Sequence, residues 1–300
     1  MSEPRQEQRS GLAALETLTT LLQRRRSAHP TKGLYEAAEL QFWWSIPRRS
    51  DELDQLFWFD ADDQPVAAAA IFDFSSASSL VYQELTFCPF VLPDATREFL
   101  AEVVGGGMAL AGTQGFEAVE LEVEQSDADM QAILADRRFA LKEHEVLIEA
   151  WIQSADRPEV SPLHDGYRIE PRSALIDRPH FLSGRSATFD EERLSQVSLY
   201  RPEFDLVAID SEGTDAGHCL FWLDPVTATG VVEPMRVNDD HQQRGLARHL
   251  LTRGVDLLAQ AGATRISIGY EPDNPASGRL YRSVGFQDTQ HNDLYSGPTS

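Results

Sequence analysis

The sequence has 300 residues, 42% of them hydrophobic, and a formal net charge of −22. This acidity argues against nucleic-acid partners and anionic membrane surfaces, both of which require a basic face. No stretch approaches the ~20 consecutive apolar residues of a membrane span, and the N-terminus lacks the apolar centre of a secretory signal. We therefore expect a cytoplasmic protein with no nucleic-acid or membrane partner. The negative field would favour a cationic substrate such as an amine, although solubility alone also explains it.

The first elements along the chain are a helix and a hairpin. Four leucines recur at helical spacing within residues 1–30 and predict an amphipathic helix: Leu12, Leu15, Leu18 and Leu22. Strand-like runs at 56–59 and 66–72 flank an acidic turn at 60–64. The same arrangement recurs at 204–209 and 216–222 around the turn 210–215. Both segments predict β-hairpins.

The two cysteines, Cys88 and Cys219, lie in separate apolar segments and suggest neither a metal site nor a disulfide.

A longer internal similarity indicates two copies of one α/β domain. Residues 115–140 and 262–287 align without a gap at an offset of 147, each with a glycine, an alternating strand, an acidic turn, a short helix and a phenylalanine. We predict a degenerate N-terminal domain at 1–155, a linker at 156–165 rich in proline and polar residues, and a C-terminal catalytic domain at 166–300.

The strongest chemical signal lies between a β-prone run and a helix in the second copy. Residues 229–237 lead through a polar turn at 238–241 into Gln-Gln-Arg-Gly-Leu-Ala at 242–247, and a leucine-rich helix then continues through Ala261. The first amides of a helix lack intrahelical acceptors and carry partial positive charge, so they can bind phosphate groups. Gly245 would let a phosphate approach the backbone closely. Alone, one glycine before a helix is equally well an ordinary turn.

The segment downstream makes the signal specific. Residues 266–270 read as a strand, 271–275 as a turn and 276–283 as a short helix. Together, Gln-Gln-Arg-Gly-Leu-Ala and Asn-Pro-Ala-Ser-Gly-Arg-Leu-Tyr-Arg-Ser-Val-Gly-Phe at 274–286 resemble, in order, the two signatures of the GNAT superfamily of N-acetyltransferases. The resemblance implies an α/β fold of tandem GNAT-type domains, each a mixed, mostly antiparallel sheet flanked by helices. The length and tandem architecture are also similar to those of mycothiol-synthase-like proteins, whose substrate residues find no match here.

The resemblance also implies an acetyl-CoA site without a metal. The backbone of Met235, Arg236 and Val237 would pair with the pantetheine amides as an added strand, and Pro234 would mark the bulge that opens the sheet. Asn274 would contact the cofactor arm, although it reads equally well as a turn-former before Pro275. The amides expected to hold the pyrophosphate are those of Gln242, Gln243, Arg244, Gly245, Leu246 and Ala247.

Two residues are expected to be catalytic, Tyr281 by the same resemblance and Glu233 because it lies on the strand beside the expected cofactor path. Tyr281 would protonate the departing thiolate as a general acid, and it would also pack against Phe286. Glu233 would accept the proton of the amine, directly or through water; the equally weighted alternative is a strand glutamate that is solvated or forms a salt bridge, for example with Arg236. Asp205, Glu203 and His218 are reserve bases. Cys219 falls on neither motif, so the acetyl group is expected to pass directly to the amine in a ternary complex.

The first copy is predicted to keep the fold but to lose the site. At the offset of 147, Glu98 stands where Gly245 does and Leu134 where Tyr281 does, with Asp94 as the helix cap. The sequence therefore predicts an enzyme that acetylates a primary amine of a small molecule. A peptide or protein N-acetyltransferase and a non-catalytic CoA-binding sensor or scaffold remain alternatives. The acceptor, acyl chain length and oligomeric state are not predicted.

Overall fold

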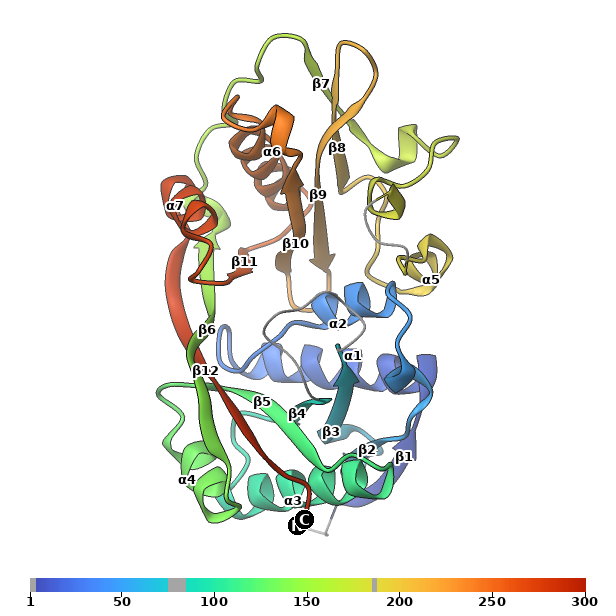
Figure 1. Ribbon diagram of the computed structural model, residues 1–300, viewed down its shortest axis with the longest axis vertical. Helices are drawn as coiled ribbons and strands as arrows, with labels where there is room; N and C mark the ends of the chain where they lie inside the picture. Colours follow the sequence, from blue (N-terminus) through green and yellow to red (C-terminus); the bar gives the residue numbers. More distant parts are fainter. Residues whose placement is uncertain (1–3, 75–84, 185–187) are drawn as a thin grey trace. The chain divides into compact units, whose positions relative to one another are not determined.

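The computed structural model describes residues 4–74, 85–184 and 188–300, and the chain forms two compact units (Figure 1). No helix in these described ranges is long and apolar enough to cross a membrane. The segments that make up the first unit are Met1–Leu40, Pro47–Leu147 and Gln290–Ser300. The segments that make up the second unit are Gln41–Ile46 and Ile148–Thr289.

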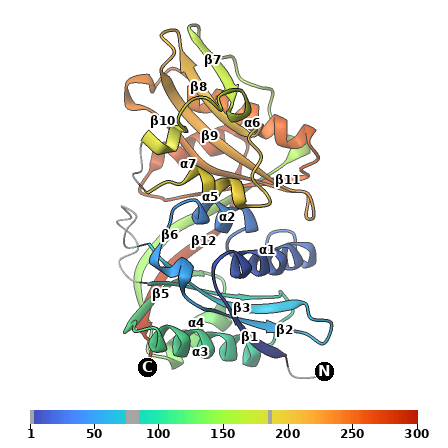
Figure 2. The ribbon, with the colours of Figure 1, turned by 90° about the vertical axis from the view of Figure 1, so that its right-hand side faces the viewer.

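The first unit is a sheet with a long helix on each face. Its sheet has the order β1-β2-β3-β4-β5-β12, in which β4 and β5 are parallel and the other neighbours are antiparallel. Helices α1 and α3 cover opposite faces of this sheet (Figure 2). Its elements are β1 (Arg5–Arg9), α1 (Gly11–Ala28), the first half of α2 (Ala37–Trp44), β2 (Gln55–Phe59), β3 (Pro65–Asp73), β4 (Leu85–Val91), α3 (Arg97–Thr113), β5 (Ala118–Glu124), α4 (Ala128–Asp136), and parts of β6 (Ala140–Gln153) and β12 (Gln287–Pro298), with the short 3-10 helix Arg49–Glu52.

The second unit repeats this plan. Its sheet has the order β6-β11-β10-β9-β8-β7, in which β10 and β11 are parallel and the other neighbours are antiparallel. Beyond its share of α2, β6 and β12, its elements are β7 (Tyr167–Pro171), α5 (Glu191–Gln196), β8 (Asp205–Asp210), β9 (Asp215–Asp224), β10 (Thr229–Val237), α6 (Leu246–Gln260), β11 (Arg265–Tyr270) and α7 (Pro275–Val284), with 3-10 turns at Ser154–Asp156, Arg172–Ala174, Phe181–Gly184 and Asp239–His241.

Helix α6 fixes the position of the predicted phosphate-binding turn because it packs closely on the sheet. Its apolar stripe is fully buried, and one position needs a glycine: a Cβ on Gly254 would lie 1.9 Å from Phe221 Cζ on β9. The helix backbone therefore contacts the strand without an intervening side chain. The buried residues of the stripe are Leu246, Leu250, Leu251, Val255 and Leu258.

The predicted elements agree with this architecture. The helix expected within residues 1–30 is α1, and the two expected hairpins are β2–β3 and β8–β9. The strand, turn and helix of each aligned segment are β5–α4 and β11–α7. The fold class, a mixed and mostly antiparallel sheet flanked by helices in each unit, is confirmed.

Each compact unit contains part of a strand that belongs to the other sequence copy. At the offset of 147, β6 of the first copy corresponds to β12 of the second, yet residues 148–153 of β6 pair with β11 in the second unit. Residues 292–298 of β12 pair with β5 in the first unit. The ranges 1–155 and 166–300 therefore stay a prediction about sequence copies and do not coincide with the packed units.

Candidate active site

An opening between two parallel strands organises the candidate site. Strand β10 pairs with β11 only from Thr229 to Val231, opposite Arg265 to Ser267. In the described part of the chain, β10 then has ladder partners in β9 alone, while β11 continues to Tyr270 with partners in β6. The facing edges of β10 and β11 beyond Val231 consequently present unpaired backbone groups, which an extended ligand could pair with.

A bulge lies where the two strands part. The register of β10 against β9 shifts between Val232 and Met235, and the Glu233–Pro234 peptide bond is cis. The predicted bulge at Pro234 is confirmed. A proline is tolerated here because the ladder is already interrupted. Trp222 Nε1 donates to the backbone oxygen of Glu233 at 2.7 Å and holds the bulge from β9.

The turn before α6 offers a series of free amides. Gly245 is the residue at the start of the helix, with φ of +76°, and no atom lies within 4 Å of the place where its Cβ would be. The backbone amides of Gln243, Arg244, Gly245, Leu246 and Ala247 donate to no acceptor among the residues that the structure describes. Five consecutive free amides at a helix start are an anion-binding arrangement.

Two side chains of this turn are held by hydrogen bonds to neighbouring residues. Arg244 donates to Tyr167 Oη and to the backbone oxygen of Asp240, the latter at 2.9 Å. Gln242 Nε2 donates to Asp239 Oδ1 at 3.0 Å. These bonds leave the exposed backbone of the turn accessible.

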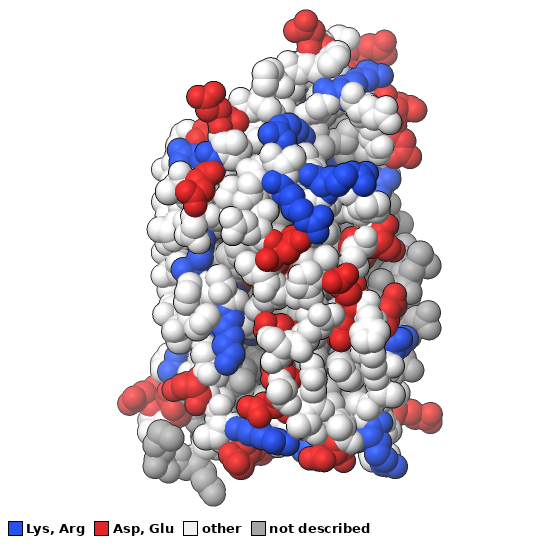
Figure 3. Space-filling view, turned by 90° about the vertical axis from the view of Figure 1, so that its left-hand side faces the viewer, with Lys and Arg blue, Asp and Glu red and all other residues white. Residues whose placement is uncertain are grey.

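Arginines surround this part of the molecule despite the overall negative charge. Basic side chains gather over the area of Figure 3 formed by α6 and α7. Most of these guanidinium groups are exposed and would attract an anion, although Arg253 and Arg282 lie within ion-pair distance of Asp256 and Asp288. The residues on the turn and the two helices are Arg244, Arg248, Arg253, Arg279 and Arg282.

Glu233 lies at the bulge, and the pKa of its carboxyl group is raised. Burial raises the pKa of Glu233 to about 7, and the negative charges of Glu149 and Glu271 add to the rise. The predicted alternative, a salt bridge to Arg236, is wrong: Arg236 Nη2 lies 3.7 Å from Asp239 Oδ1 instead. Arg236 is exposed on the outward side of β10, so its guanidinium does not neutralise the half-buried carboxyl. A carboxyl with a pKa near neutrality can exchange protons with a substrate.

Tyr281 lies on α7 beside the same opening. Its side chain is buried, with its ring 5.6 Å from that of Tyr270 and 6.3 Å from that of Phe286. Burial raises the pKa of its hydroxyl, as do charges on Cys219 and Glu233. The hydroxyl therefore stays protonated at neutral pH. The structure brings Tyr281, Glu233 and Cys219 into one electrostatic neighbourhood.

The remaining predicted residues have simpler surroundings. Asn274 caps α7, with its side chain accepting from Ser277 N at 3.4 Å, so the turn-forming role is observed. Burial raises the pKa of the Cys219 thiol well above its ordinary value, which leaves it a poor nucleophile. Glu203 is exposed and lies 3.7 Å from Arg201.

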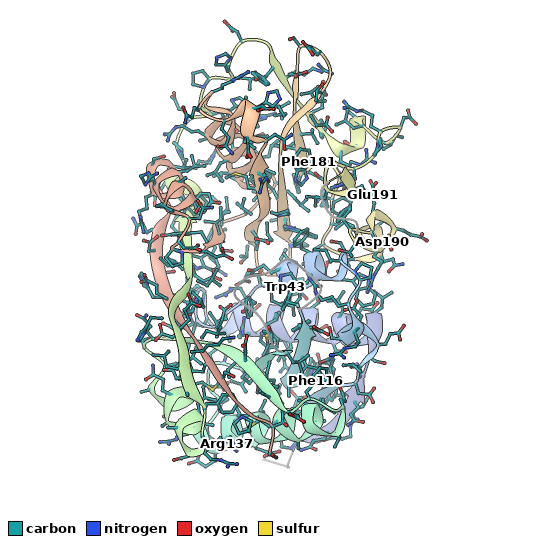
Figure 4. The ribbon with its side chains drawn as sticks, in the orientation of Figure 1. Trp43, Phe116, Arg137, Phe181, Asp190 and Glu191 are labelled. Carbon is teal, nitrogen blue, oxygen red and sulfur yellow. The ribbon has the colours of Figure 1, made fainter. Side chains whose placement is uncertain are left out.

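Two reserve bases belong to a buried network that the sequence did not predict. Asp205 Oδ1 accepts from His218 at 2.6 Å, and Oδ2 accepts from His180 at 2.8 Å and Tyr200 at 2.9 Å. These donors hold the pKa of Asp205 below its usual value against the effect of burial. Asp205 is thus a fixed anion. Phe181, labelled in Figure 4, stacks on the His218 ring at 5.1 Å.

The same network contains side chains of the types that bind metal ions. Ligand atoms of His180, Asp205 and His218 lie within 4.8 Å of one another. However, His180 Nδ1 accepts from Leu182 N, which places the proton on Nε2 and directs it to Asp205. The three side chains are linked by hydrogen bonds, but His218 Nδ1 is buried without a hydrogen-bond partner among the described residues. Nothing in the sequence marked His180, because it precedes a short irregular turn far from both motifs.

The first unit keeps the same local plan with different residues. Its parallel pairing is equally short, from Leu85 opposite Val119 to Thr86 opposite Glu120. The helix α3 begins after Thr96, whose hydroxyl accepts from Phe99 N at 3.2 Å. Thr96 therefore stands at the position of Gly245. The expected cap at Asp94 and the expected counterpart at Glu98 are both wrong, because α3 begins at Arg97, two residues before the position that the offset of 147 gives for the start of α6.

Comparison with known proteins gives a consistent result. Residues 172–286 match the model of the acetyltransferase (GNAT) family. A mycothiol acetyltransferase of Clavibacter sepedonicus is 32% identical over 172 residues, which is 57% of this chain and 54% of that protein. The chain thus spans about half the length of this curated relative.

Two solved structures are similar along the whole chain. A tandem GNAT protein from the clavulanic acid biosynthesis pathway has a TM-score of 0.68 at 13% identity and covers 99% of both chains. A GCN5-related N-acetyltransferase from Sphaerobacter thermophilus has a TM-score of 0.56 at 15% identity, over 98% of this chain and 96% of that one. At these identities the likeness shows the fold. Residues 172–286 thus match the GNAT family of acetyltransferases, and the two units of the chain share the fold of a tandem GNAT protein.

Proposed function

We propose that the protein transfers the acetyl group of acetyl-CoA to a primary amine of a small molecule. The observation that carries this proposal is the run of free amides from Gln243 to Ala247 beside the opening of the sheet. A diphosphate accepts several amide hydrogen bonds at once, and the positive end of α6 favours its charge. The arginines on α6 and α7 would add attraction for the other phosphate groups.

The opening itself would hold the extended arm of acetyl-CoA. The free edge of β10 at Met235, Arg236 and Val237 would pair with the pantetheine amides, as a peptide pairs with a sheet edge. Asn274 would lie near the other side of the arm. This arrangement leads the thioester to the bulge, where Glu233 and Tyr281 are neighbours.

The chemistry follows from the two titratable groups. An ammonium group must first lose a proton, and Glu233 would accept it, since a base with a pKa near 7 is mostly ionised at slightly alkaline pH. The amine nitrogen then attacks the thioester carbonyl carbon, and a backbone amide near Met235–Val237 would stabilise the oxyanion. The carbon–sulfur bond breaks as Tyr281 donates its proton to the leaving thiolate. The nitrogen loses its second proton as the intermediate collapses, and this proton would return through solvent to the tyrosinate of Tyr281. The products are an amide and free CoA, and Glu233 then releases the first proton to solvent.

Two observations favour this function over its alternatives. A covalent acetyl-cysteine is disfavoured because the Cys219 thiol is buried and has a raised pKa. A CoA sensor without turnover has no use for a protonated hydroxyl and a neutral-range carboxyl beside the expected thioester. The named relatives make a mycothiol-related amine the first acceptor to test, ahead of a peptide or protein N-terminus.

The experiment is a thiol-release assay with acetyl-CoA and a panel of small amines and peptides. The proposal predicts turnover with at least one small amine above the rate of hydrolysis and loss of that turnover in Gly245→Glu. Thiol release from peptides alone would favour the peptide alternative. CoA binding without turnover on any acceptor would favour the sensor.

A further inference from the structure

The first unit has an opening of its own between its two parallel strands. Strand β4 pairs with β5 only at Leu85 and Thr86, and the two strands then part. Beyond that point, residues of both strands line a cavity of about 160 Å³. A water molecule needs roughly 10–15 Å³ of such space, so the cavity has room for a small organic molecule. All of its lining residues belong to the first unit.

The wall of this cavity is largely apolar and reaches the surface. Exposed Lys32, Arg97 and Asp129 line its mouth, so a ligand could enter from solvent. A ligand with an apolar body would displace water from the buried part of the wall, as in most small-molecule sites. The buried apolar residues come from β4, β5, α3 and α4: Phe87, Cys88, Phe90, Leu100, Val123 and Met130.

Arg25 on α1 places a guanidinium group in the same wall. The side chain is 6% exposed, and its Cζ lies 5.4 Å from the centre of the Phe90 ring and 3.0 Å from the place where a Cβ on Gly33 would be. Both of these neighbours line the cavity, as Arg25 itself does. Nη2 donates to the backbone oxygens of Leu34 and Tyr35. Nε is buried and has no hydrogen-bond partner among the described residues, so one donor of this cation is left for a ligand.

No acidic side chain in the described ranges forms an ion pair with Arg25. The adjacent Arg26 takes the carboxylate of Glu36, and Glu39 accepts from the backbone amide of Glu36 at 2.6 Å. Burial and the charge of Arg26 lower the pKa of Arg25 to about 10, despite the opposite effect of the two acids, so the group stays charged at neutral pH. A buried charge without a counter-charge is costly, and an anion in the cavity would offset that cost.

We propose that this cavity binds a small carboxylate, whose charge meets Arg25 and whose body packs on the apolar wall. The site is separate from the proposed acetyl-CoA site and does not depend on it. A single negative charge matches the guanidinium of Arg25. CoA does not fit, because Thr96 already caps an amide at the start of α3. An anion of higher charge, such as phosphate, would be repelled by the four acids that line the cavity: Glu122, Glu124, Asp127 and Asp129.

Methionine methyl groups allow each unit to be followed in one sample. Met130 lines the cavity of the first unit, and Met235 lies on β10 at the opening of the second. In NMR spectra of protein labelled with methyl-¹³C methionine, sodium benzoate or butyrate should shift the Met130 signal, which Met130→Leu identifies. Benzamide and butyramide, the uncharged counterparts, should bind at least about tenfold more weakly, because they lose the charge-assisted hydrogen bond. CoA should shift the Met235 signal, which Met235→Leu identifies, and not that of Met130.

A pair of matched variants tests the role of the guanidinium. Arg25→Met should weaken benzoate binding at least about tenfold. Arg24→Met, the same change at a neighbour whose guanidinium lies 3.2 Å from Asp60, should bind benzoate as the wild type does. Should Arg25→Met not fold, the comparison of benzoate with benzamide on the wild type decides.

Several results would overturn the inference. These are an unmoved Met130 signal with both carboxylates, equal affinity for benzoate and benzamide, undiminished binding by Arg25→Met, or a Met130 shift caused by inorganic phosphate or CoA. A Met235 signal that does not respond to CoA would contradict the proposed function of the second unit and leave the carboxylate site intact.

Discussion

The starts of α3 and α6 are equivalent places in the two units, but their backbone amides are capped differently. Both helices follow a strand that parts from its parallel neighbour after two or three paired residues. At α3, the hydroxyl of Thr96 accepts from Phe99 N, so the helix satisfies one of its own amides. At α6, Gly245 has no side chain and the amides remain free. The same backbone plan therefore either caps its own amides or leaves them free for the proposed anion site, and the residue at the start of the helix makes the difference.

Helices α4 and α7, which are equivalent at the offset of 147, show a similar contrast. Leu134 on α4 and Tyr281 on α7 occupy equivalent positions at the offset of 147, and both are buried. Leucine contributes only packing, whereas tyrosine packs and also presents a protonated hydroxyl to the opening. A domain can thus lose its chemistry at a few positions and keep its core.

Replacing the proposed base should have the largest kinetic effect. Glu233→Gln removes the proton acceptor at the bulge and should lower kcat about 10³-fold with little change in CoA affinity. Glu203→Gln, an exposed acid in the same unit, should be neutral. In the wild type, kcat/KM should fall as the pH drops below about 7, since the raised pKa of Glu233 leaves it protonated there. A Glu233→Gln variant with normal kcat would remove the carboxyl from the mechanism.

Replacing the proposed acid should have a smaller effect. Tyr281→Phe keeps the packing against Phe286 but has no proton to give, so kcat should fall about 10²-fold while CoA still binds. Tyr295→Phe, on β12, serves as the control. Stopped-flow measurement of thiol release would check this prediction, and unchanged turnover would make Tyr281 equivalent to Leu134 of the first copy.

The smallest expected effect is in the first copy. Thr96→Ala removes the side-chain cap of α3 and should lower the free energy of unfolding by about 1 kcal/mol. CoA affinity should not change, because the first copy is proposed to lack the site. Urea unfolding and a CoA titration of the same sample would check both parts. A change in CoA affinity would show that the two copies differ less than proposed.

The sequence predicted most of the local structure. The two hairpins and the leucine stripe of α6 each follow a periodicity that only one secondary structure fits, and the structure has them where expected. The bulge at Pro234 was also predictable, because a proline cannot continue a central ladder.

Long-range and fine-scale features were not predictable. An alternating strand such as β6 has the same pattern whichever sheet it joins, so its pairing with β11 leaves no trace in the sequence. Asp94 and Thr96 are both good caps, and only the path of the loop selects Thr96. His180 contacts Asp205 through tertiary packing, at a sequence separation of 25.

The central claim concerns the anion site at α6, and a calorimetric titration of CoA tests it most directly. Wild-type protein should bind CoA, and Gly213→Glu, a glycine of similar φ at an open turn in the same unit, should bind equally well. Gly245→Glu should bind at least about 100-fold more weakly, a loss of roughly 2.7 kcal/mol. Absence of binding by the wild type, or undiminished affinity in Gly245→Glu, would contradict the account.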